Sequence, residues 1–173
     1  MKILKQSTYE TCLACCLLMV VDGKRKDEIE IWKHGWEIGQ YLIGQLNYVA
    51  NKYGKSVEAY IENKYYFNQL ENQKEKKVKL INKKIDTKLL GKLLENGPVI
   101  LYSDRYNPDG AGYVHAPHFT LALEQKDKSF KIADPFDGKL KEISAKDVRK
   151  RIGSLRNHLK YSPVLVAFPQ VRN

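Results

Sequence analysis

The spacing of hydrophobic positions changes part-way along the chain, from a helical period to an alternating one. Residues 11–21 are apolar almost all round, which predicts a helix buried in the middle of the fold. Weaker helical patterns follow, and Ser144 stands where the last of them needs an N-cap. These further helices are expected at 27–33, 39–53, 64–70, 86–94 and 144–151.

Short apolar or alternating runs, most of them in the later part of the chain, predict strands. Two of these runs, 119–123 and 130–133, flank the turn residues 126–128 and therefore predict a hairpin. Other strands are expected at 56–61, 98–102 and 164–168, turns at 107–112 and 135–138, and an exposed segment at 74–79. Helices followed by a mostly antiparallel sheet define an α+β fold.

The length of 173 residues favours a single domain over residues 1–173. Hydrophobic residues make up 43% of the chain and charged residues 29%, as in ordinary globular proteins. The longest apolar run, Cys12–Val21, is too short to span a membrane. Glu10 precedes this run and no small-residue cleavage site follows it. We therefore expect a buried helix rather than a signal peptide, and a cytoplasmic location.

The formal net charge of +10 raises the question of nucleic-acid binding. The lysines are scattered over several segments, however, and no RNA- or DNA-binding motif accompanies them. A solvated, lysine-rich surface is the preferred interpretation, and we do not expect nucleic acid as a partner. The alternative, a basic protein that binds nucleic acid, predicts an affinity that falls steeply with salt.

The three cysteines all lie between positions 12 and 16, so they cannot link distant parts of the chain. Reduced thiols are therefore expected. Together with His115 and His118 they could supply nitrogen and sulfur ligands to a metal. Cysteines spaced along a regular helix lack the turn of a zinc site, so we expect neither a metal nor a cofactor.

A cysteine nucleophile needs a base, a group that holds the base, and donors for the oxyanion. Cys12 occupies the first turn of the buried helix, where the helix dipole favours a thiolate. Gln6 lies six residues earlier, and its amide is a candidate oxyanion donor beside the N–H of Cys12. His118 directly precedes one strand of the predicted hairpin and Asp134 ends the other, so the two are expected side by side.

These assignments have alternatives. His115 competes with His118 as the base, although His118 is preferred because it adjoins the strand. His115 is then expected in a mobile loop near the cleft, where it could touch substrate. Asp134 could be a turn-forming residue before Pro135. Cys12 could be a structural cysteine, as Cys15 and Cys16 are expected to be.

The segment from Gln6 to Cys12, with the apolar helix after it, resembles the start of family C39 peptidases, the bacteriocin-processing cysteine peptidases. That family shows a Gln, five residues, and a Cys at the head of a buried helix, often with another cysteine where Cys16 falls. Segments 118–123 and 130–135, followed by Gly138, resemble its His-led strand and Asp-Pro turn, and 97–100 resembles the strand before them. Residues 24–90 show no such match.

The resemblance implies a papain-like α+β fold, with N-terminal helices packed on a C-terminal antiparallel sheet. It implies a thiol peptidase, a hydrolase that needs no cofactor and cuts a peptide or protein substrate. In that case Cys12 is the nucleophile, His118 the base and Asp134 the residue that orients it. Gln6 completes the oxyanion hole.

The sequence departs from the family next to the nucleophile, where Thr11-Cys12-Leu13 replaces the usual Asp-Cys-Gly. Leu13 is expected to narrow the cleft beside the thiol, which leaves the type of substrate open. Two alternative functions follow: an inactive, peptidase-like module that binds peptides, and an acyl transferase that uses the same thiol. The best-known family members are fused to membrane ABC transporters and cut after a double glycine, an activity that we do not assume for this chain.

Overall fold

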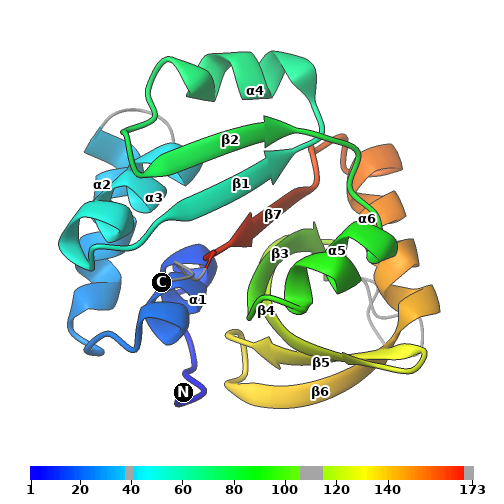
Figure 1. The fold of residues 1–173 in the computed structure, drawn as a ribbon. Coiled ribbons are helices and arrows are strands. Elements are labelled where there is room, and N and C mark those ends of the chain that lie inside the picture. The colour runs from blue at the N-terminus through cyan, green and yellow to red at the C-terminus, as the bar shows by residue number, and fades with distance from the viewer. Residues whose placement is uncertain (38–40, 106–114, 170–173) are drawn as a thin grey trace.

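The computed structural model describes residues 1–37, 41–105 and 115–169, which form an α+β fold (Figure 1). The helices are α1 (Cys12–Val21), α2 (Asp27–Glu37), α3 (Tyr41–Lys52), α4 (Lys64–Glu71), α5 (Thr87–Leu94) and α6 (Ala145–Asn157). The strands are β1 (Val57–Ile61), β2 (Val78–Asn82), β3 (Val99–Asp104), β4 (Pro117–Lys126), β5 (Ser129–Asp134), β6 (Lys139–Ser144) and β7 (Val164–Ala167).

The strands form one sheet in the order β2-β1-β7-β3-β4-β5-β6. β1 and β2 run parallel, and the other neighbouring pairs are antiparallel. The mostly antiparallel sheet is thus confirmed, and so is the hairpin of β4 and β5, in which Leu121 pairs with Ala133. This hairpin brings the start of β4 and the end of β5 to the same end of the sheet.

Helices cover both faces of this sheet (Figure 1). α1 packs against β4 on one face, the face that α3 and α4 cover near β1 and β2. α5 and α6 pack on the opposite face over β3 and β4. Successive residues of β4 accordingly enter two different cores, Leu121 the first and Ala122 the second. The expected packing of helices on the sheet is confirmed, although the second half of the chain also supplies two of the helices.

The buried helix predicted from the apolar run is α1. Residues 13–18 have no exposed surface, as expected for a helix that is apolar all round. The helix ends at Asp22, which adopts a left-handed conformation (φ 51°) and whose N–H bonds to the carbonyl of Met19. Burial on all sides fixes the helix axis, and with it the position of its first residue.

The N-terminal segment lies beside the turn between β5 and β6. The N–H of Gln6 donates to the carbonyl of Pro135 at 2.6 Å, and a side chain at Gly138 would contact Lys5. Leu4 is anchored to α1, because its N–H contacts the sulfur of Met19 at 3.3 Å. The segment that leads into α1 therefore passes directly by the end of β5.

Two strands were not expected. Segment 74–79 was predicted to be exposed, but Val78 is buried and begins β2, where apolar residues alternate with Lys79 and Asn82. β6 is also lysine-rich and buries only Ile143. Both are edge strands, and lysines on an edge discourage pairing with other chains, which weakens the hydrophobic signal of the strand.

The remaining expected elements are found within a few residues of their predicted bounds, and Ser144 caps α6 by accepting from the N–H of Asp147. The turn expected at 107–112 and the helix start expected at Gly39 lie outside the described residues. Within the described ranges, the helices are too short or too polar to cross a bilayer.

Candidate active site

The centre of the site is a buried pair formed by the β4–β5 hairpin. Nε2 of His118 lies 2.8 Å from Oδ1 of Asp134, and the two side chains are 7% and 4% exposed. Burial alone would raise the pKa of Asp134, but its hydrogen bonds with His118 and Lys141 outweigh burial and hold that pKa far below its ordinary value. The carboxylate therefore stays ionised and can orient the imidazole.

The thiol of Cys12 lies near enough to the same imidazole to affect its pKa. Burial lowers the pKa of His118, while hydrogen bonds with Asp134 and then with Cys12 raise it, and the net result is a raised pKa. Asp134 occupies Nε2, so Nδ1 is the ring nitrogen left to face the sulfur. The sheet thus brings His118 and Asp134 close to the N-terminus of α1, which lies more than a hundred residues earlier in the chain.

Gln6 is buried, and its backbone N–H bonds to the carbonyl of Pro135, the residue after Asp134. Its Nε2 donates to the carbonyl of Thr8 at 2.6 Å, which leaves the second N–H of the amide available to donate elsewhere. Its Oε1 has no partner within the described part of the chain. Gln6 also lines a cavity of about 210 Å³, together with Tyr9 and Phe136.

Phe136 shields the histidine. Its ring meets that of His118 edge to face, with the ring centroids 6.4 Å apart, and its N–H donates to Oδ1 of Asp134 at 3.0 Å. Arg105 lies over the same ring, 3.3 Å from the centroid. An aromatic cover of this kind excludes water from the imidazole–carboxylate contact, which strengthens it.

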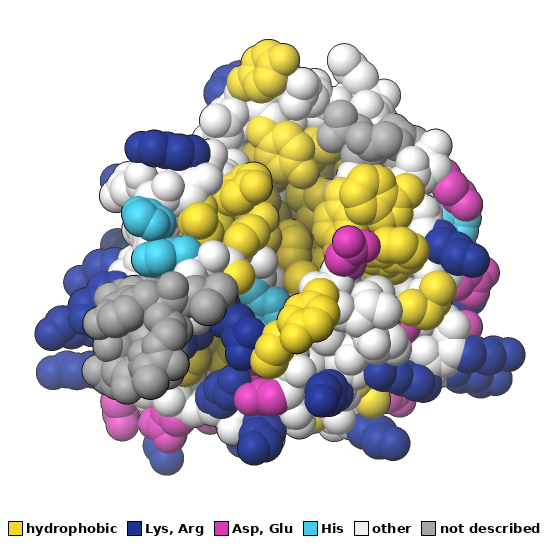
Figure 2. Space-filling view, turned by 180° about the vertical axis from the view of Figure 1, so that it is seen from behind, with side chains coloured by type: hydrophobic (Ala, Val, Ile, Leu, Met, Phe, Trp, Pro, Cys, Tyr) yellow, Lys and Arg dark blue, Asp and Glu magenta, His cyan; other side chains and the backbone are white. Residues whose placement is uncertain are grey.

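Tyrosine side chains of β3 and α3 lie within electrostatic reach of the thiol of Cys12. Tyr102 of β3 stacks on Phe119 of β4 at 4.2 Å and meets Tyr161 edge to face at 6.5 Å. Burial raises the pKa of Tyr102, and the nearby Tyr161 and Cys12 raise it further. Tyr41 of α3 also lies within electrostatic reach of Cys12. Figure 2 shows a hollow on one face whose walls are hydrophobic side chains, with a histidine at its edge.

One sequence-based expectation was wrong. Leu13 was expected to narrow the cleft, but its side chain has no exposed surface and belongs to the core beneath α1. His115 was expected in a loop where it could touch substrate, and it lies in the loop before β4. Its Nδ1 lies 2.6 Å from Oδ2 of Asp104 at the end of β3, and its ring packs on His158 with centroids 4.1 Å apart. A role in touching substrate stays a prediction.

Cys15 and Cys16 are fully buried, as expected. Burial raises the pKa of Cys15 to about 12 and that of Cys16 well above its usual range, so neither is a nucleophile at neutral pH. Their sulfurs contact the carbonyls of Leu4 and Phe119. Among the described residues, no three His, Cys, Asp or Glu side chains are placed to hold a metal ion.

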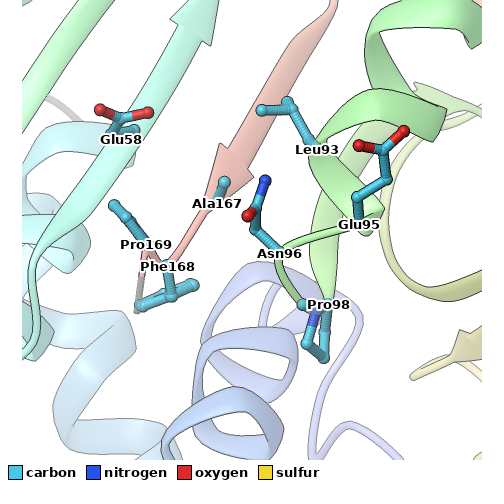
Figure 3. Close-up of a pocket in the computed structure, with 9 residues that line it drawn as sticks. Glu58, Leu93, Glu95, Asn96, Pro98, Ala167, Phe168 and Pro169 are labelled. Atoms are coloured by element: carbon cyan, nitrogen blue, oxygen red, sulfur yellow. The ribbon is translucent and has the colours of Figure 1, made fainter. Parts of the chain in front are cut away.

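A larger cavity, of about 690 Å³, lies elsewhere (Figure 3). It is lined by Glu58 of β1, Leu93 of α5, Ala167 of β7 and the turn before β3 (Figure 3). β3 begins beside this cavity, and Ser103, one residue before its other end, pairs with His118. The cavity and the histidine therefore lie toward opposite ends of the strand. Its lining includes no cysteine or histidine among the residues that the structure describes.

The fold is similar to that of a solved structure, a proposed C39-like peptidase from Bacillus anthracis. The two share a TM-score of 0.55 over 97% of this chain and 94% of that chain, at 11% sequence identity. No protein-family model matches the sequence, and a search of curated proteins found no match. The chain therefore has a C39-like peptidase fold. At this level of identity, the likeness concerns the fold alone.

The sequence analysis missed the side chains that surround the predicted group. Lys141 contacts Asp134, and Phe136 covers His118. The turn at 135–138 was predicted, and a turn between two strands implies that the chain returns alongside Asp134. A strand assigned to the alternating segment after this turn would have placed Lys141 near that carboxylate.

Proposed function

We propose that the protein is a cysteine peptidase in which Cys12 attacks the peptide carbonyl, His118 carries the proton and Asp134 orients His118. The buried pair of His118 with Asp134, close enough to Cys12 for the thiol to act on the imidazole, is the observation that carries this proposal. An imidazole between a carboxylate and a thiol stabilises the thiolate as an ion pair and holds a proton ready for the leaving group.

In the first step, the sulfur of Cys12 forms a bond to the carbonyl carbon, and the carbonyl electrons move onto the oxygen. The N–H of Cys12, which has no acceptor within the first turn of α1, and the free N–H of Gln6 can donate to this oxyanion. When the oxyanion collapses, the C–N bond breaks and His118 gives its proton to the departing nitrogen.

In the second step, a water molecule attacks the thioester carbon while His118 takes its proton. The C–S bond then breaks, which frees the carboxylic acid and regenerates the thiolate–imidazolium pair. Asp134, held ionised by its partners, keeps Nδ1 of His118 directed at the sulfur throughout.

The aromatic surroundings of Cys12 indicate which peptides fit. Tyr102 and Tyr41 lie within electrostatic reach of the thiol, and Tyr161 packs against Tyr102, so a peptide side chain near the thiol could gain by packing on these rings. We expect peptides with a bulky apolar or aromatic residue near the scissile bond to be cut faster than matched peptides with glycine there. Equal rates for the two peptides would contradict this choice of substrate.

Alkylation by iodoacetamide, measured from pH 5 to 8 and followed by mapping of the modified residue, tests the chemistry. Cys12 is expected to react at least about tenfold faster than free cysteine at mildly acidic pH, because His118 stabilises its thiolate. Cys15 and Cys16 serve as internal controls, since both are fully buried. A reaction no faster than that of free cysteine would overturn the proposal.

Peptide turnover by the unmodified protein and by Cys12→Ala separates the peptidase from an inactive binding module. The departure at Leu13 suggested the inactive module, but a fully buried Leu13 cannot block the cleft. A peptidase loses turnover in Cys12→Ala. A binding module shows no turnover with any peptide, whether or not Cys12 is present.

A further inference from the structure

Asp134 has a second cationic partner besides His118. Its Oδ1 faces His118, while its Oδ2 accepts a hydrogen bond from Nζ of Lys141 at 2.6 Å. Lys141 stands on β6 and also reaches Oδ2 of Asp137 at 2.8 Å. The Lys141 side chain is 34% exposed, whereas that of Asp134 is 4% exposed. A single buried carboxylate is therefore shared by an imidazole and an ammonium group.

This sharing affects the charge of the imidazole. A carboxylate beside a histidine favours the imidazolium, and a cation beside that carboxylate weakens the effect. Lys141 also repels the imidazolium directly across the carboxylate. Both effects act in the same direction and favour neutral His118.

We propose that Lys141 is a positioning residue of the active site, which fixes Asp134 and sets the pH at which His118 loses its proton. The inference rests on the proposed function, because His118 matters to catalysis only if it serves Cys12. Without Lys141, the full charge of Asp134 would act on the imidazole, and His118 would keep its proton to a higher pH.

Other charged groups surround this pair. The thiol of Cys12 faces His118 from α1, and Arg105 lies over the ring of Phe136 that covers His118. From α6, Arg151 acts on Asp134 at longer range. The remaining neighbours are Asp137 in the turn, which binds Lys141, and Cys16, which lies within electrostatic reach of Asp134. Apart from His118, Lys141 is the cationic side chain in the described residues that pairs with Asp134 at hydrogen-bond distance.

Replacing Lys141 should leave the fold intact. Lys141 stands on an edge strand and is partly exposed, and Asp134 keeps its bonds from His118 and from the N–H of Phe136 when the lysine is removed. Lys141→Met keeps the apolar stem of the side chain and removes the charge. Lys141→Gln gives a second variant with a polar end. Lys141→Arg restores a cation at the same place.

The test is an NMR titration of the His118 ring proton on Cε1 in the full chain, assigned by its disappearance in His118→Gln. Lys141→Met and Lys141→Gln should raise the titration midpoint by about 0.5 pH unit or more, and Lys141→Arg should return it close to the original value. Lys131→Met, at an exposed lysine on β5, is the matched control and should shift it by less than about 0.2 unit.

Unchanged or lowered midpoints in both neutral variants would overturn the role of Lys141. If Lys141 had a purely structural role, its neutral variants would be less active at every pH and the titration midpoint of His118 would not move. Lys141→Arg would then have no shifted midpoint to restore. The titration does not depend on catalysis. If Cys12 proves unreactive while the midpoint shifts, the proposed function fails and the electrostatic role of Lys141 stands.

Discussion

The two halves of the candidate site are held in place by different forces. Cys12 comes from α1, whose next six residues are completely buried among apolar side chains. His118 and Asp134 come from the β4–β5 hairpin and are held by a chain of polar contacts that continues to Lys141. Packing therefore positions Cys12, the proposed nucleophile, whereas hydrogen bonds and charge position His118, the proposed base.

This difference has a practical consequence. A substitution in the helical half should act mainly through stability, because close packing transmits any change of volume. A substitution in the polar half should act mainly through activity and its dependence on pH. Substitutions in each half test whether effects on stability and effects on activity can be separated in this way.

The largest effect is expected for His118→Ala. Loss of the base should reduce peptide hydrolysis by roughly 10²–10⁴-fold, because no other group then carries the proton between Cys12 and the leaving amine. His34→Ala is a suitable control, since His34 lies on α2 and pairs with Glu37. The measurement is the steady-state rate of hydrolysis of one peptide by the wild type, by His118→Ala and by His34→Ala. A variant that kept more than about a tenth of the activity would exclude His118 as the base.

The next effect concerns stability, in the helical half. A Cβ added at Gly44 of α3 would lie 2.1 Å from the carbonyl oxygen of His34 in α2, so Gly44→Ala forces the two helix backbones apart. The expected loss in the free energy of unfolding is about 3 kcal/mol, measured by urea denaturation.

Gly153→Ala provides the matched control for this prediction. Gly153 lies inside α6, and a Cβ there would meet nothing within 4 Å. Alanine should therefore stabilise the protein by up to about 1 kcal/mol through helix propensity. If both alanine variants changed stability in the same direction, close packing of α2 on α3 would not explain the effect at Gly44.

Much of the fold could be predicted from local pattern. The all-apolar segment became α1, and the alternating runs on either side of residues 126–128 became β4 and β5. The edge strands β2 and β6 escaped prediction because strands with one exposed face and an open edge carry lysines at many positions. Only a few residues of these two strands are buried, such as Val78 and Ile143, so the hydrophobic pattern that would predict a strand is short.

The site was predictable to the extent that it depends on strand ends. His118 and Asp134 were expected side by side because they flank one hairpin, and the structure places them in contact. Neighbours that arrive from other parts of the chain could not be predicted in the same way. The expectation for Leu13 failed for a different reason. Leu13 adjoins Cys12 in the sequence, but its side chain faces the core. The catalytic roles themselves stay predictions.

The third prediction concerns the polar half and the pH dependence of stability. The pKa of Asp134 in the folded protein lies well below the value of about 3.9 expected in the unfolded chain. Its ionised form therefore stabilises the fold above about pH 4, and this contribution is lost as the pH falls toward the folded pKa. Asp134→Asn keeps the shape and removes the charge, so it should cost on the order of 2 kcal/mol at pH 7.

The loss of unfolding free energy caused by Asp134→Asn should become smaller when the pH falls below about 4. Below that pH the ionised carboxylate of the wild type stabilises the fold less. Urea denaturation at pH 7 and pH 3 measures this difference. Asp127→Asn is the control, since Asp127 occupies an exposed turn with φ 52°, a conformation that asparagine adopts readily. A cost for Asp134→Asn that stayed the same at both pH values would mean that shape, rather than charge, holds the polar half together, and the contrast with the packed helical half would disappear.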